Sequence, residues 1–169
     1  MNFLEASKIV ARFSGGEALS FRLAMSGTAA PFEIFLAAAA ATQGRTAQVS
    51  TLPFGTLAQS LHDVPTPGQT EVFLLTPWDF APETDWRSGL PARELSFDEV
   101  KQRAIQTAQL LRDRRGARLL YLPAPVLPIF SDGATNAELA TFLLGLSSSL
   151  GAKILPSDAF ALSSFLATG

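Results

Sequence analysis

Ser26 stands between an apolar run and a helical stretch, a position where a hydroxyl can act on a ligand. Residues 21–26 read Phe-Arg-Leu-Ala-Met-Ser, typical of a buried strand, and a helical pattern covers 32–43 after the link Gly-Thr-Ala-Ala-Pro. A helix N-terminus carries unpaired backbone N–H groups that can hold an oxyanion or a phosphate. The pattern predicts Ser26 as a candidate nucleophile, with Gly27 and Thr28 as ligand-binding residues. In the alternative interpretation, Ser26 and Thr28 only cap the helix.

A serine hydroxyl is a weak nucleophile unless a base activates it. The single histidine, His62, falls at the end of a short helical segment before a proline-rich turn, where such residues mostly interact with solvent or the helix dipole. Cysteine is absent, which excludes thiolate catalysis and cysteine-zinc sites, and the carboxylates lack metal-site spacing. The glycine-rich nucleotide fingerprints are also missing. We therefore expect no metal and no cofactor.

Apolar runs alternate with helical patterns along all 169 residues. Capping boxes at Ser96–Glu99 and Thr135–Glu138 predict the starts of two helices. Because strands that are apolar throughout belong in a sheet covered on both faces, the chain is predicted to be a three-layer α/β/α sandwich, flavodoxin-like, with a parallel five-stranded sheet. The whole chain, 1–169, is expected to be one domain, with an N-terminal arm (1–20, helical at 2–12) and a lid-like loop (80–95). The expected strands lie near residues 21–25, 46–52, 71–75, 117–122 and 152–155.

In such sheets, ligands bind at the carboxyl ends of the strands. Gly55, Trp78 and Asp79 follow the second and third predicted strands and are expected to line a cleft with Ser26. Trp78 supplies apolar contact and Asp79 accepts a hydrogen bond from the ligand. The alternatives are a turn cap for Asp79 and a lid folded onto the domain for the Trp78 loop.

Taken together, these elements resemble the N-terminal SGNH-hydrolase-like domain of FkbH-like proteins over residues 20–165. The resemblance implies that Ser26 corresponds to the nucleophile, Gly55 to the second-block glycine, and Asp79 to the third block. Asp158 stands where the final Asp-x-x-His begins, yet Ala161 occupies the histidine position. In full proteins of that family, a haloacid-dehalogenase-type domain follows and makes acyl-carrier-protein-linked extender units. Its aspartate motif would be expected beyond position 169.

The composition limits the partners. Net charge is −2, so no strong field attracts nucleic acid or an anionic membrane. Hydrophobic residues make up 47% and charged residues 17%, against roughly 25% charged in a typical domain, which makes a docking surface or a homo-oligomer plausible. The apolar stretch 31–41 is shorter than the ~20 residues of a membrane span, and the N-terminus does not read as a signal peptide. We expect a cytoplasmic protein.

Three hypotheses follow for the function. The broken triad favours a catalytically degenerate SGNH-like domain that binds a small acyl or anionic ligand, or a protein partner such as a carrier protein or biosynthetic enzyme. The second is an esterase or acyltransferase that uses Ser26, with His62 or an external group as base. The third is a structural oligomerisation scaffold.

Overall fold

The computed structural model describes residues 1–27, 29–53, 55–80, 82, 95–123 and 130–155. Much of the predicted 80–95 loop lies outside these residues. Helices and strands alternate in the order α1 (Phe3–Arg12), β1 (Glu17–Met25), α2 (Ala30–Thr42), β2 (Arg45–Thr51), α3 (Leu57–Ser60), β3 (Gln69–Leu75), α4 (Pro77–Phe80), α5 (Phe97–Arg112), β4 (Arg118–Tyr121), α6 (Gly133–Ser149) and β5 (Lys153–Ile154).

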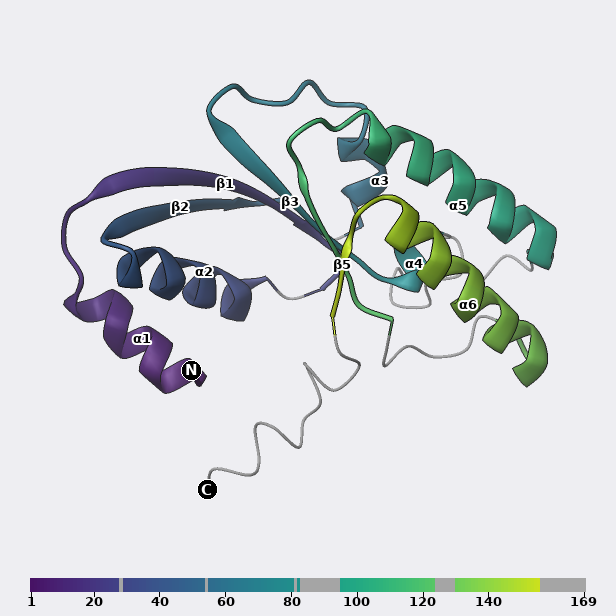
Figure 1. Cartoon of the computed structure of the whole chain (residues 1–169), viewed down its shortest axis with the longest axis horizontal. Helices are drawn as coiled ribbons and strands as arrows, with labels where there is room; N and C mark the ends of the chain where they lie inside the picture. The colour runs from purple at the N-terminus through teal and green to yellow at the C-terminus, as the bar shows by residue number, and fades with distance from the viewer. Residues whose placement is uncertain (28, 54, 81, 83–94, 124–129, 156–169) are drawn as a thin grey trace.

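The five strands form one parallel sheet in the order β2-β1-β3-β4-β5. Figure 1 shows α1 and α2 on one face of the sheet and α5 and α6 on the other. The predicted fold class, a three-layer α/β/α sandwich with a parallel five-stranded sheet, is confirmed. The strand order is the flavodoxin-like one, in which the chain direction across the sheet reverses between β1 and β3.

The strands differ from the prediction mainly at their ends. β1 begins four residues earlier than expected, at Glu17, because its polar first half pairs with β2 from Glu17 opposite Arg45 onward. β5 is shorter than expected and contains only two residues. β3 is the central strand, and its residues from Glu71 to Leu75 are all buried.

The helix starts show which capping predictions hold. Ser96 and Glu99 form the predicted box at α5. The box predicted at Thr135 is wrong: the N-cap of α6 lies three residues earlier, at Asp132, whose carboxylate accepts from the N–H groups of Ala134 and Thr135. Asp132 takes the cap because it lies just before the first turn, where a carboxylate also interacts favourably with the helix dipole.

The main core lies between the sheet and the helices α3, α5 and α6, and includes Phe73, Phe80, Val100, Tyr121 and Leu143. A charged cluster adjoins it, around Arg22 in the middle of β1 and Glu71 in the amino half of β3. Glu71, 6% exposed, accepts from Arg22 across 3.4 Å and pairs with Arg114 across 3.6 Å. Arg114 is itself buried, 7% exposed, and also donates to the Ser60 carbonyl. Within the described residues, no helix has the length and apolar character needed to cross a membrane.

Candidate functional site

The carboxyl ends of β1 and β3 bring Ser26 and Asp79 together. Met25, the last residue of β1, pairs with Leu74 of β3, so these two neighbouring strands end side by side. Ser26 follows at once, while β3 continues through Thr76 into the single turn α4, which carries Asp79. This point is the topological switch of the sheet, where open α/β folds bind their ligands.

Ser26 is bonded directly to a carboxylate. Its hydroxyl donates to Asp79 Oδ1. The other carboxylate oxygen, Asp79 Oδ2, accepts from the Thr76 backbone N–H at 2.6 Å and from the Thr76 hydroxyl at 2.7 Å. Asp79 is 4% exposed, so these three donors compensate its burial. The side chain of Asp79 is therefore held in a fixed position, with Ser26 as its contact on the β1 side.

Tyr121 lies next to this pair, at the end of β4. It pairs with Leu75 in the sheet, and its ring packs edge-on against Phe80 with 6.1 Å between centroids. Burial raises the pKa of the Tyr121 hydroxyl far above its usual value, and the negative charge of Asp79 raises it further. Tyr121 therefore stays neutral at physiological pH and cannot serve as a base for Ser26.

The other predicted site residues are Trp78, Gly55, Gly27, Thr28 and Asp158. Trp78 is 7% exposed, so little of its ring is available for the apolar ligand contact predicted for it. Gly55 has φ +77°, a left-handed conformation that by itself explains the glycine. A Cβ on Gly27 would meet only the flexible end of Met25 at 3.3 Å, so space alone does not demand a glycine there. Thr28 and Asp158 lie outside the described residues.

The start of α2 does not offer the anion cradle that the sequence suggested. The N-cap is Ala29, without a side-chain cap, so Ser26 does not cap this helix. The N–H groups of Phe32 and Glu33 donate to the Ala29 carbonyl at 2.8 and 3.0 Å, and Pro31 has no N–H. Glu33 also brings a negative charge to the first turn and accepts from the Thr51 hydroxyl. An anion at this end of α2 would meet a carboxylate and few available donors.

His62 lies beside a residue that contacts the middle of β1, away from the strand end that carries Ser26. The next residue, Asp63, pairs with Arg22, in the middle of β1. Arg22 and Ser26 are four residues apart, which is roughly 13 Å along a strand that rises ~3.3 Å per residue. His62 is exposed, and its backbone N–H donates to Gln59. The structure therefore does not bring His62 to Ser26 as a replacement base.

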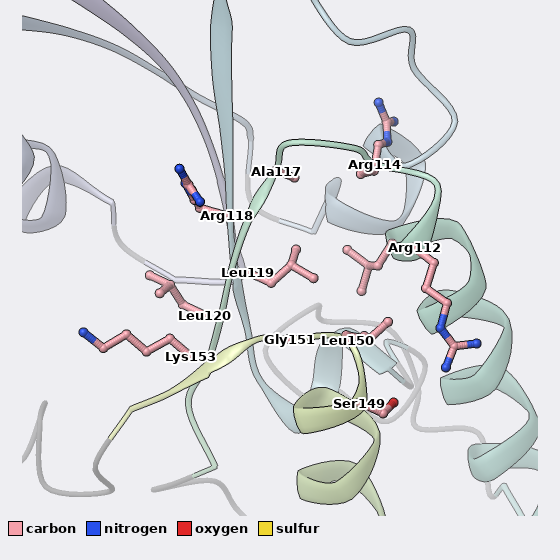
Figure 2. Close-up of a pocket in the computed structure, with 11 residues that line it drawn as sticks. Arg112, Arg114, Ala117, Arg118, Leu119, Leu120, Ser149, Leu150, Gly151 and Lys153 are labelled. Atoms are coloured by element: carbon pink, nitrogen blue, oxygen red, sulfur yellow. The ribbon is translucent and has the colours of Figure 1, made fainter.

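A cavity of about 590 Å³ lies elsewhere, where the C-terminal ends of α5 and α6 meet β4 and β5. The residues that line it include the cations Arg112, Arg114, Arg118 and Lys153, and no acidic residue is among them. Figure 2 shows these four side chains pointing in different directions. They therefore do not converge on one anion.

The fold and site define a doubly wound α/β domain with a Ser–Asp contact at its switch point. No protein-family model matches the sequence, and no curated protein matches it. Among solved structures, the fold is similar to the N-terminal part of the protein BF1531 from Bacteroides fragilis, a structure described as containing a phosphatase domain complexed with Mg. The TM-score is 0.65 at 9% sequence identity, over 97% of this chain and 46% of that one. At this identity the likeness shows the fold alone, and the chain spans about half the length of its structural neighbour.

The neighbouring structure is complexed with Mg, so the residues of this chain can be compared with the ligands that Mg²⁺ needs. Mg²⁺ in proteins takes octahedral oxygen ligands, commonly one or two carboxylates together with substrate phosphates and waters. Between residues 1 and 155, within the described ranges, no three His, Cys, Asp or Glu side chains gather in a way that could hold a metal. At the switch point, Asp79 already accepts from Ser26 and Thr76. These residues do not fit a magnesium site, and no magnesium-dependent step follows from them.

Proposed function

We propose that this chain is a catalytically degenerate α/β domain that binds a ligand or a protein partner at the switch point between β1 and β3. The observation that carries the proposal is the direct hydrogen bond from Ser26 to Asp79, while Asp63, the residue after His62, pairs with Arg22 in the middle of β1. Asp79 is held by the N–H and hydroxyl groups of Thr76 and accepts from the Ser26 hydroxyl, so it acts as a positioning group for Ser26.

The arrangement favours a ligand that donates hydrogen bonds. Asp79 Oδ1 accepts from Ser26, and Glu33 sits in the first turn of α2, so these two charged side chains near the strand ends are negative. A hydroxyl, amide or amine of the ligand can replace the Ser26 donor on Asp79, and the freed Ser26 hydroxyl can then bond to a second ligand atom. This makes a hydroxyl- or amine-bearing ligand a better candidate than the anionic one that the sequence suggested.

A protein partner is the other form of the proposal. The element-level resemblance to the N-terminal domain of FkbH-like proteins supports a role beside a biosynthetic enzyme or a carrier protein. The structural neighbour, in which a similar fold is part of a longer chain, is compatible with such a role. In either form, the domain contributes binding and no bond cleavage.

The test of degeneracy is an esterase assay with p-nitrophenyl acetate on the wild type, Ser26→Ala and His62→Ala. We expect the three rates to agree, because within the described residues His62 lies away from Ser26 and Asp79 positions the Ser26 hydroxyl. A wild-type rate that falls by about 10²-fold or more in Ser26→Ala would favour the esterase hypothesis instead.

The test of binding follows the backbone amide signals of Ser26, Gly27 and Asp79 during titration with ethanolamine, acetate and phosphate. Shifts with ethanolamine, reduced in Asp79→Asn, support a donor ligand at this site. Shifts with acetate or phosphate and none with ethanolamine would contradict it.

A further inference from the structure

The strand β2 has one open edge. Its only strand neighbour among the described residues is β1, which pairs with it along its whole length. The Leu52 N–H donates to the Leu23 carbonyl, which fixes the alternation of the backbone: Ser50 and Leu52 point toward β1. Ala47, Val49 and Thr51 therefore point their N–H and C=O groups away from the sheet.

This edge lacks the features that usually prevent pairing with another strand. Proteins protect sheet edges with short strands, prolines, lysines or bulges. β2 is seven residues long and contains no proline or lysine. Its one charged residue, Arg45, stands at the end of the strand and pairs with Glu17 at 3.5 Å.

An apolar helix layer lies beside the same edge. α2 packs against β2, and the Thr51 hydroxyl donates to Glu33 of α2. All but two of the α2 residues are apolar, yet only Ala38 and Ala40 are buried. α1 packs against α2 with Phe3 against Phe35, and it leaves Leu4 62% exposed. A helix that is apolar all round normally has neighbours on every side.

We propose that a second copy of this chain covers this edge, with the two β2 strands antiparallel across a two-fold axis near Gln48. Ala47 of each copy then faces Val49 of the other, and both point outward, so their N–H and C=O groups can pair. The sheet becomes continuous across the two copies, and their apolar helix layers lie on the same face of it. Each layer gains apolar contact that it lacks in the single chain.

Self-pairing suits this edge better than a charged or unrelated partner. A two-fold interface uses the same surface on both subunits, so an apolar layer meets an apolar layer. With the axis near Gln48, each Arg45 lies opposite Thr51 of the second copy, at the two ends of the pairing. Like charges therefore do not face one another.

The test is the mass of the full chain by light scattering over a concentration series, for the wild type, Val49→Pro and Val49→Ala. Both substitutions change the same half-buried side chain, but only proline removes the outward N–H, which bonds to nothing in β1. We expect a wild-type dimer, a dimer in Val49→Ala, and a dissociation constant that is roughly tenfold or more higher in Val49→Pro. A monomeric wild type, or a Val49→Pro variant that dimerises as the wild type does, would overturn the proposal.

A second measurement covers the case in which Val49→Pro does not fold. Hydrogen exchange of the wild-type amides of Ala47, Val49 and Thr51 should slow as the protein concentration rises, because the second copy protects them. Leu4→Lys should raise the dissociation constant, whereas Leu144→Lys, on the opposite face of the sheet at 41% exposure, should leave it unchanged. Exchange at these amides that does not depend on concentration would contradict the paired edge.

Discussion

The charged cluster around Glu71 provides a quantitative test of the packing that supports the site. We expect Glu71→Gln to destabilise the domain strongly, since it leaves the guanidinium of Arg114, whose side chain is 4% exposed, without its negative partner. Breaking a buried ion pair from one side costs about 3–5 kcal/mol. The Glu71 contacts of 3.4 and 3.6 Å are longer than strong charge-assisted hydrogen bonds of roughly 2.7–2.9 Å, and Arg114 keeps its bond to the Ser60 carbonyl. The cost should therefore fall near the lower end, about 3 kcal/mol.

The assay is urea denaturation followed by tryptophan fluorescence, with thermal melting by circular dichroism. A loss of about 3 kcal/mol corresponds to a fall in Tm of roughly 6–12 °C for a chain of this size. The matched control is Glu17→Gln, which breaks a pair with Arg45 of similar length, 3.5 Å, in which the side chains are 74% and 46% exposed. It should cost less than about 1 kcal/mol.

The double variant Glu71→Leu/Arg114→Met separates pairing from side-chain loss. Because it removes both buried charges, it should be more stable than Arg114→Met or Glu71→Gln alone. If Glu71→Gln costs no more than Glu17→Gln, burial does not amplify this interaction and the reasoning fails.

Three further predictions concern ionisable groups and a helix cap. Tyr121 is the single tyrosine, so alkaline absorbance titration should show no tyrosinate until the protein unfolds. The stability that the neutral Tyr121 contributes should be complete below pH ~10 and lost above it. Asp79→Asn should allow ionisation at lower pH, and a free titration near pH ~10 in the wild type would contradict the burial. Hydrogen bonds from Thr135 and Ala134 lower the pKa of Asp132, so its stabilising effect should be present above about pH 4 and lost as pH falls through the folded-state pKa; Asp132→Asn should flatten that part of the acid denaturation curve. Ser96→Ala should cost about 1 kcal/mol in urea denaturation by loss of the α5 capping box, and an unchanged midpoint would count against the cap.

The sequence predicted the sheet because the central strand residues are apolar and the connections are short. It missed the first half of β1, where Glu17 and Ser20 are polar, because residues 17–19 extend beyond β3, pair with β2 alone and need no apolar cover. It also missed the cap at Asp132. Two residues in that segment could serve as caps, and propensity alone does not decide between them.

The candidate site was only partly predictable. The positions of Ser26 and Asp79 at neighbouring strand ends follow from the alternation of elements. Their direct bond does not follow from it, because it depends on the single turn α4 at residues 77–80, which had been predicted as a loop. The burial of Trp78 and Arg114 could not be predicted either. Composition does not show which side of a turn faces the core, nor which arginine pairs with a buried carboxylate.

The two proposals have a joint consequence that can be measured. In an antiparallel pair of β2 strands, the strands of the two copies run in opposite directions. The carboxyl ends that carry Ser26 in the two copies therefore point to opposite sides of the continuous sheet. Neither copy then covers or completes the Ser26–Asp79 site of the other. We therefore expect one ligand per chain, no cooperativity, and equal ethanolamine-induced shifts at Ser26 and Asp79 in the wild type and Val49→Pro. A ligand affinity that changes with protein concentration would mean that the sites communicate, and the two-fold arrangement near Gln48 would then be wrong.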